Sequence, residues 1–315
     1  MNRVLVTGAD GFVGQALCPL LENAGWTVRK ATRTARPGRI AVGNIGPDTD
    51  WRAALESVTA VVHLAARVHV MADMTHDPLA EYRAVNCAGS ANLARQAAQA
   101  GVKRLVYVST IKVNGESSGN LPFRADDMPH PQDPYAHSKW EAEQALHRIA
   151  AETGLEVVVL RPPLVYGPGV KANFLRLLDL IERGLPLPFG AVNNRRSLLF
   201  LGNLADAIRI CLSHPAAAGK TYLLCDGAAL SSADLVRSLA VALEKSPKLF
   251  PIPPALLRLA GLLTGKNAEV GRLLDSLEVD GSAIEQELDW HPPYSMAQGL
   301  AITADWYRTS RSTPT

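Results

Sequence analysis

The sequence contains no long apolar run and no marked excess of either charge. Its most apolar stretch, residues 254–263, falls short of the ~18 residues that a membrane span needs, and Arg258 interrupts it. Lysine and arginine total 32 against 30 aspartate and glutamate, a net charge of +2. This balance generates no strong field toward nucleic acid or an acidic membrane surface. We therefore expect neither nucleic acid nor a membrane as a partner.

The chain also lacks paired cysteines and a metal-ligand pattern. Its four cysteines stand far apart, with no Cys-x-x-Cys pair: Cys18, Cys87, Cys211 and Cys225. Such cysteines are typical of buried thiols in a reducing compartment. Three histidines on different expected elements lack the spacing of metal ligands, so no metal site is predicted: His63, His69 and His76. Residues 1–8 read as a strand and a turn without a signal-peptide pattern, and we expect a cytoplasmic protein.

What the chain does contain is an alternation of strands and helices. Its 315 residues correspond to one large or two modest domains. Strands are expected at residues 3–7, 27–32, 40–45, 60–65, 105–109 and 156–161, and helices at 12–23, 77–100 and 134–152. Nearly continuous Val, Leu and Ile strands between helices predict an α/β fold with a doubly wound parallel sheet.

After residue 161 the pattern changes. A strand at 197–201, a helix at 204–213 and a strand at 221–225 are expected to return to the sheet, and the remainder is mostly helical. We predict a sheet domain of residues 1–165 plus about 195–228, and a smaller lobe of about 166–194 and 229–315. Because ligands bind at the carboxyl edge of such sheets, the lobe beside that edge would supply substrate contacts.

Residues 7–14, Thr-Gly-Ala-Asp-Gly-Phe-Val-Gly, join the first expected strand to the first helix. This is the context that a dinucleotide-binding turn requires. Gly8 allows the tight turn, Gly11 lets the backbone approach a pyrophosphate, and Gly14 permits close packing of helix and sheet. The helix amides and the positive end of the helix dipole would face the phosphates. The motif therefore predicts an NAD(P)-binding Rossmann domain.

The end of the second strand bears on which dinucleotide is bound. Thr32 is followed by Arg33, and no acidic residue occurs between Val28 and Asn44. An NAD site usually places a carboxylate here to hold the ribose 2′-hydroxyl, whereas a guanidinium can bind a 2′-phosphate. The sequence favours NADP(H), with NAD(H) left open. A solvated basic strand end is the alternative interpretation.

A Tyr-x-x-x-Lys pair, Tyr135 and Lys139, follows the helix start Asp133-Pro134. The spacing places both side chains one turn apart on the same helix face. An ammonium near a phenol lowers its pKa toward neutrality, which makes tyrosine a usable acid and base. Ser109-Thr110 ends a central strand, where a hydroxyl could hydrogen-bond the substrate oxygen that Tyr135 protonates.

Together these residues resemble the extended short-chain dehydrogenase/reductase family, in its nucleotide-sugar epimerase/dehydratase/reductase branch. The resemblance spans nearly the whole chain and includes His63 to Ala66, Asn86 with Gly89, Arg161 to Pro163, Val165 to Pro168 and Arg195-Arg196. It implies cofactor contacts from Gly8, Asp10, Gly11, Phe12, Val13, Thr32, Arg33, Asn44, Ile45, Leu64, Ala65, Ala66, Asn86, Tyr135, Lys139 and Pro162. It implies catalytic roles for Thr110, Tyr135 and Lys139, and substrate binding by Thr110, Asn173, Arg196 and Arg272. Asn173 could instead cap a helix, and Arg196 could form a surface ion pair.

The chain departs from the family's dehydratases at residues 110–115. There it reads Thr-Ile-Lys-Val-Asn-Gly, where dehydratases have Thr-Asp-Glu-Val-Tyr-Gly. Ile111 and Lys112 cannot supply the matched acid and base of water elimination, so a dehydratase is disfavoured. Asn114 also replaces the usual tyrosine of the 4-epimerases. The stretch is similar to that of polysaccharide-locus epimerases and 4-keto reductases.

The leading hypothesis is an NADPH-dependent reductase acting at C4 of a UDP-linked hexose, with a 4-keto-(6-deoxy-N-acetyl)hexosamine of surface-polysaccharide biosynthesis as substrate. The alternative is a UDP-hexose 4-epimerase for UDP-glucose or UDP-N-acetylglucosamine. A non-catalytic NADP(H)-sensing module is a third interpretation, disfavoured by the intact Tyr/Lys pair. The resemblance also implies a homodimer formed by the helices at 77–100 and 134–152, although packing on the sheet explains much of the same pattern.

Overall fold

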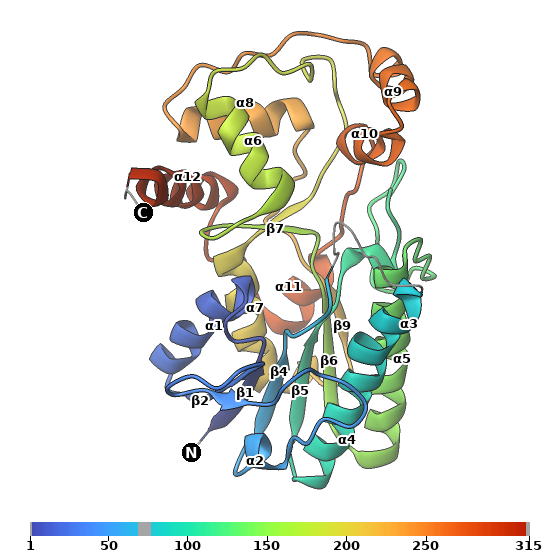
Figure 1. Ribbon diagram of the computed structural model, residues 1–315, viewed down its shortest axis with the longest axis vertical. Helices are drawn as coiled ribbons and strands as arrows, with labels where there is room; N and C mark the ends of the chain where they lie inside the picture. Colours follow the sequence, from blue (N-terminus) through green and yellow to red (C-terminus); the bar gives the residue numbers. More distant parts are fainter. Residues whose placement is uncertain (1, 69–76, 313–315) are drawn as a thin grey trace.

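The computed structural model describes residues 2–68 and 77–312. Parallel strands form a seven-stranded central sheet in the order β3-β2-β1-β4-β5-β6-β9 (Figure 1). The strands are β1 Arg3–Thr7, β2 Thr27–Thr32, β3 Ile40–Ala41, β4 Ala60–His63, β5 Arg104–Val108, β6 Glu156–Arg161 and β9 Thr221–Leu223. The order steps outward from β1 in both directions, which confirms the predicted doubly wound α/β fold.

Helices cover both faces of the sheet (Figure 1). One face packs against α1 (Phe12–Asn23), α7 (Leu201–Ser213) and α11 (Ser282–Leu288). The other packs against α2 (Arg52–Leu55), α4 (Ser90–Gln99) and α5 (Pro134–Thr153). Consecutive residues of β1, β4, β5 and β6 enter opposite cores, which is why these central strands are mostly apolar.

The sequence around α5 explains where this helix begins and ends. The Asp133 carboxylate accepts a hydrogen bond from the backbone amide of Ala136 at 2.6 Å, and Pro134 occupies the first turn. Gly154 ends the helix in the left-handed conformation, with φ of 76°. The predicted placement of Tyr135 and Lys139 in the first turns of one helix is therefore confirmed.

A smaller lobe lies beyond β6. β7 (Leu164–Tyr166) and β8 (Leu198–Phe200) form a separate two-stranded sheet. Helices α6 (Ala172–Glu182), α8 (Ser232–Ala242) and α12 (Met296–Ser312) share an apolar core with these strands, and α9 (Pro254–Leu263) packs against α10 (Asn267–Leu274) (Figure 1). Short 3₁₀ turns are η2 (Ile111–Val113) and η3 (Pro215–Ala217). The exact bounds of the two domains stay a prediction.

Three predicted elements differ from the structure. The strand expected at 197–201 does not return to the central sheet, because Pro162 and Pro163 end β6 and the chain resumes as β7, which β8 then joins. The strand expected at 40–45 stops at Ala41, since Gly43 turns the chain with φ of 69°. The helix expected at 77–100 contains α3 (Pro78–Tyr82), the π-helical segment η1 (Arg83–Gly89) and α4. Within the described ranges, no helix is long and apolar enough to cross a membrane.

Candidate active site

The glycine-rich turn between β1 and α1 is as tight as its sequence predicts. Gly8 has φ of +67°, a conformation that side-chain-bearing residues rarely adopt. A Cβ at Gly14 would lie 2.5 Å from the Gly8 carbonyl oxygen, so only glycine permits this approach of helix and turn. In the described part of the chain no side chain caps the N-terminus of α1, which begins Phe12-Val13 after Gly11. Backbone amides at a helix N-terminus are a donor set that fits a dinucleotide pyrophosphate.

Asp10, inside this turn, forms ion pairs with two arginines beyond β2. Its carboxylate lies 2.8 Å from the Arg39 guanidinium and 3.4 Å from that of Arg36. Thr32 and Arg33, the two residues predicted at the end of β2, do not contact Asp10 in this way. The Thr32 hydroxyl donates to the carbonyl of Thr34, and Arg33 is exposed. No acid is predicted near this basic segment from the sequence, because Asp10 comes from another loop. Arg36 and Arg39, which the sequence did not single out, lie beside the glycine-rich turn through their ion pairs with Asp10.

A hydrogen-bonded chain connects the turn to the loop after β4. The Thr7 hydroxyl accepts from the backbone amides of Leu64 and Ala65, both at 3.2 Å, and lies 2.6 Å from Nδ1 of His63. On the far side of the ring, Nε2 of His63 lies 2.9 Å from the Ser90 hydroxyl. The loop of Leu64, Ala65 and half-buried Ala66 is thereby held against the glycine-rich turn.

The series of hydrogen bonds continues from Ser90 to α5, the helix that carries Tyr135. The Ser90 hydroxyl donates to the backbone carbonyl of Asn86, and the Asn86 amide donates to the Ser138 hydroxyl at 2.9 Å. Ser138 in turn donates to the carbonyl of Tyr135 at 2.7 Å. Asn86 is 1% exposed and also accepts from the amide of Arg67, at 2.8 Å. Asn86 thereby joins η1, the β4 loop and α5, and its contact with the cofactor stays a prediction.

The Lys139 ammonium is buried and points at the end of β5. Its Nζ donates to the carbonyl of Val108 at 2.7 Å and lies 4.0 Å from the centroid of the Tyr107 ring. Burial lowers the pKa of Lys139 to about 7, although the Glu143 carboxylate opposes the shift. Lys139 therefore changes its charge near neutral pH.

The expected lowering of the Tyr135 pKa is not found. Burial raises the pKa of Tyr135, and the negative charges of ionised Asp133 and Tyr82 add to the increase. The physical reason is that the Lys139 ammonium faces Val108 and Tyr107. The Tyr135 ring packs edge-on against Tyr82, with centroids 6.1 Å apart.

The two hydroxyls at the end of β5 have different surroundings. Ser109 is buried and donates to the Glu143 carboxylate. Thr110 is half-buried and caps η2, where its hydroxyl accepts from the amide of Lys112 at 3.3 Å. Since that hydroxyl keeps its proton available for donation, Thr110 is the better placed of the two to hydrogen-bond a substrate oxygen. The Lys112 amine forms ion pairs with Glu116 and Asp133.

A buried ion pair that the sequence did not reveal underlies this region. The Arg161 guanidinium lies 2.6 Å from the Glu143 carboxylate, with side chains 4% and 0% exposed. Arg161 also donates to the Asn114 side chain at 2.9 Å, and Asn114 donates to the carbonyl of Arg124. Both polar atoms of the Asn114 side chain are thus used in hydrogen bonds that join the end of β6 to the loop of Arg124.

The predicted substrate residues lie in the lobe. Arg196 donates to the backbone carbonyls of Arg272, at 2.7 Å, and Asp275, at 3.1 Å, and its pKa is lowered by burial. The structure therefore brings Arg196 and Arg272 together, and Arg196 bonds to carbonyls instead of forming the surface ion pair considered as the alternative. Asn173 is exposed in the first turn of α6, and Lys171, not Asn173, holds the cap position.

Other candidates occupy loops beside the strand ends. Pro162 is buried, and its carbonyl accepts from the amide of Ile111 at 3.0 Å. Asn44 and Ile45 follow β3, and Ile45 packs against the core shared with α4 and α5. Among the described residues no group of His, Cys, Asp and Glu could hold a metal, while His69 and His76 lie outside the described residues.

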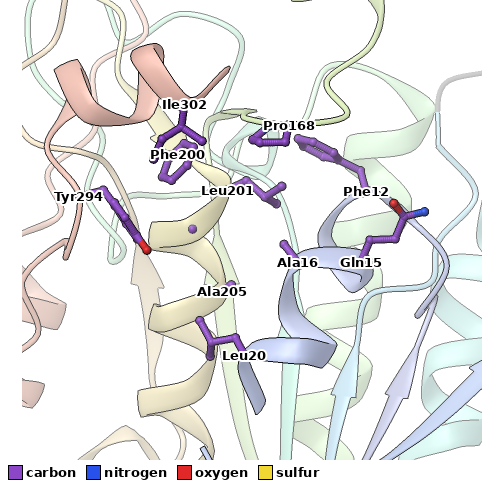
Figure 2. Close-up of a pocket in the computed structure, with 11 residues that line it drawn as sticks. Phe12, Gln15, Ala16, Leu20, Pro168, Phe200, Leu201, Ala205, Tyr294 and Ile302 are labelled. Atoms are coloured by element: carbon purple, nitrogen blue, oxygen red, sulfur yellow. The ribbon is translucent and has the colours of Figure 1, made fainter. Parts of the chain in front are cut away.

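A cavity of about 430 Å³ opens between α1, α7 and the start of α12 (Figure 2). Phe12 and Pro168 face it from one side, and Phe200, Tyr294 and Ile302 face it from the other. Its lining is mostly apolar and contains none of Thr110, Tyr135 and Lys139. It lies in the seam between the sheet domain and the lobe.

Comparison with known proteins decides the family. The model of the NAD dependent epimerase/dehydratase family matches residues 4–225. The chain belongs to this family. Its predicted resemblance to the extended short-chain dehydrogenases/reductases is confirmed, as is the expectation of an NAD(P)-dependent enzyme.

Individual members of the family extend the likeness beyond the matched residues. A UDP-glucose 4-epimerase of Vibrio cholerae is 44% identical over 96% of this chain and 94% of its own. A GDP-6-deoxy-D-mannose reductase of Pseudomonas aeruginosa is 28% identical over 97% of each chain. The solved structure of MoeE5 in complex with UDP-glucose and NAD has a TM-score of 0.78 and 27% identity, covering 98% of this chain and 100% of its own.

Proposed function

We propose that the protein is a UDP-hexose 4-epimerase that interconverts UDP-glucose and its C4 epimer. The observation that carries the proposal is the 44% identity, nearly end to end, to the Vibrio cholerae UDP-glucose 4-epimerase. This reverses the order of the two sequence-based hypotheses, which placed a 4-keto-sugar reductase first. The reductase stays the second candidate, since the Pseudomonas aeruginosa GDP-6-deoxy-D-mannose reductase is also related over the whole chain.

The chemistry needs a base and acid at the C4 oxygen of the sugar. A bound dinucleotide supplies a hydride acceptor and donor. In the proposal Tyr135 Oη takes the proton from the C4 hydroxyl and returns it after the keto sugar has turned, and Thr110 Oγ1 hydrogen-bonds the same oxygen. Burial raises the pKa of Tyr135 and the Lys139 amine faces Val108 and Tyr107, so this step requires the phenol to ionise against its surroundings. Lys139, one turn along α5, would contact the dinucleotide. Arg196 and Arg272, joined in the lobe, would bind the diphosphate.

We further propose that the dinucleotide is NADP(H). Supporting this, Arg33, Arg36 and Arg39 outnumber the single carboxylate of Asp10 at the end of β2, so a 2′-phosphate would meet excess positive charge. Retention of the dinucleotide distinguishes the two candidate functions. An epimerase regenerates its cofactor in each cycle and gains from retaining it, whereas a reductase must release the spent cofactor after each turnover.

The test is to incubate the purified protein with UDP-glucose without added dinucleotide and to separate the products by chromatography. Formation of UDP-galactose, abolished in Tyr135→Phe, is expected. A second aliquot is denatured and the released dinucleotide is identified by mass. If no UDP-hexose is epimerised while NADPH is oxidised by a UDP-4-keto-6-deoxyhexosamine, the epimerase proposal is wrong and the reductase takes its place. The homodimer and the cytoplasmic location stay predictions, the former checked by analytical ultracentrifugation.

A further inference from the structure

Tyr107 lies beneath the Lys139 ammonium. Tyr107 is fully buried on β5, Lys139 is 1% exposed on α5, and Nζ of Lys139 lies 4.0 Å from the centroid of the Tyr107 ring. We propose that Tyr107 is a positioning residue whose ring face holds the Lys139 amine at the end of β5 and favours its charged form. The proposal deepens the proposed function, on which its kinetic consequence rests.

The electrostatics of the buried amine explain why a ring is needed. A buried ammonium loses its hydration, and among the described residues its hydrogen-bond acceptor is one carbonyl, that of Val108. The negative face of an aromatic ring attracts a cation, most strongly where water is excluded. Because burial raises the pKa of Tyr107 well above its usual value, the ring remains a neutral phenol throughout the working pH range. The attraction is therefore to the ring face and not to a phenolate.

The other groups near the amine do not replace the ring. Glu143, one helical turn further along α5, raises the pKa of Lys139 but is itself paired with Arg161. His63 on β4 is neutral, since burial lowers its pKa to about 3, and Tyr135 is a neutral phenol whose pKa is raised. Burial lowers the pKa of Lys139, and the attraction of the ring face opposes that shift together with Glu143. Without the ring face the pKa would be lower, and a smaller fraction of the amine would be charged at neutral pH.

The experiment measures the Lys139 pKa directly by NMR, in protein labelled with ¹⁵N at the lysine side chains. The Lys139 signal is assigned as the one that Lys139→Met removes. Tyr107→Phe keeps the ring face and should titrate within a few tenths of a unit of the native protein, while Tyr107→Leu should lower the pKa by about one unit. The proposal fails if Tyr107→Leu leaves the pKa unchanged, or if Tyr107→Phe shifts it equally, since the hydroxyl would then be responsible.

A fluorinated series keeps the test informative if Tyr107→Leu does not fold. Phenylalanines with one to five ring fluorines at position 107 preserve size while progressively weakening the negative ring face. The Lys139 pKa should fall stepwise with fluorine number, and a flat series overturns the proposal. This titration needs no substrate, so it is independent of the epimerase assay. If the proposed function holds, the alkaline limb of kcat/KM for UDP-glucose should move to lower pH by the same amount in each variant.

Discussion

The hydroxyl of Thr7 lies 2.6 Å from Nδ1 of His63, and the direction of this hydrogen bond can be assigned. Both lone pairs of the hydroxyl are used by the amides of Leu64 and Ala65, so its proton must go to Nδ1. His63 is then protonated at Nε2 and donates to Ser90, whose own proton goes to the Asn86 carbonyl. Each of these hydrogen bonds therefore donates in the same direction, from the glycine-rich turn toward η1.

Removing the Thr7 hydroxyl should loosen the dinucleotide site. In Thr7→Val the amides of Leu64 and Ala65 and Nδ1 of His63 lose their partner inside the protein, at a cost of about 1–3 kcal/mol in the free energy of unfolding. Dinucleotide affinity, measured by fluorescence titration, should fall with it. Thr7→Ser keeps the hydroxyl and is the matched control. Equal affinity in Thr7→Val and the native protein would contradict this role.

His63 should make the protein sensitive to mild acid. Burial, with a smaller contribution from Lys139, lowers its pKa from 6.5 to about 3, so between these pH values the unfolded state binds more protons than the folded state. Stability must therefore fall as the pH decreases through this window, by up to about 1.4 kcal/mol per pH unit. Urea unfolding at several pH values should show a steeper loss for the native protein than for His63→Gln. His291→Gln alters a histidine whose side chain is 64% exposed and should keep the native slope.

Breaking the ion pair between Glu143 and Arg161 should strongly destabilise the fold. Both side chains are buried, so Arg161→Met leaves the Glu143 carboxylate without a counter-ion at a cost of about 3–5 kcal/mol. The exposed pair of Arg237 and Asp234, with side chains 50% and 53% exposed, is the control. Arg237→Met should change the free energy of unfolding by less than about 1 kcal/mol. Chemical denaturation measures the free energy of unfolding of both variants. Similar losses in Arg161→Met and Arg237→Met would show that burial does not distinguish the two ion pairs.

The sequence predicted those parts of the site that depend on neighbouring residues. The glycine-rich turn requires glycine for local reasons, and Tyr135 and Lys139 share a helix face because of their spacing. The partners of these residues could not be predicted in the same way. His63 meets Thr7 and Ser90, and Glu143 meets Arg161, only because the sheet order brings β1, β4, β5 and β6 together. The inference about the Tyr135 pKa was wrong for the same reason, since the position of the Lys139 ammonium is set by Tyr107 and Val108 on β5.

Catalysis should depend on the Tyr135 hydroxyl. Tyr135→Phe retains the ring that packs against Tyr82 but removes the acid and base, so turnover of UDP-glucose should fall by about 10²–10⁴-fold while the fold is kept. Dinucleotide released on denaturation should be unchanged in amount. Tyr294→Phe, in the seam cavity, is the control and should retain native turnover. Native turnover in Tyr135→Phe would exclude the proposed chemistry.

Asp10 should tune the choice between the two dinucleotides. Its carboxylate partly neutralises Arg36 and Arg39, at 3.4 and 2.8 Å, and a 2′-phosphate would compete with it for the same guanidiniums. Asp10→Asn removes the competing charge and should raise NADP(H) affinity by up to about tenfold, the effect of roughly one exposed charge-assisted contact, with little change for NAD(H). Arg39→Ala should have the opposite effect on NADP(H). Fluorescence titration of both dinucleotides against both variants measures this, with Arg237→Ala as a distant charge control. If Asp10→Asn and Arg39→Ala change the two affinities in parallel, these arginines do not contact the 2′-phosphate, and the preference for NADP(H) loses its physical basis.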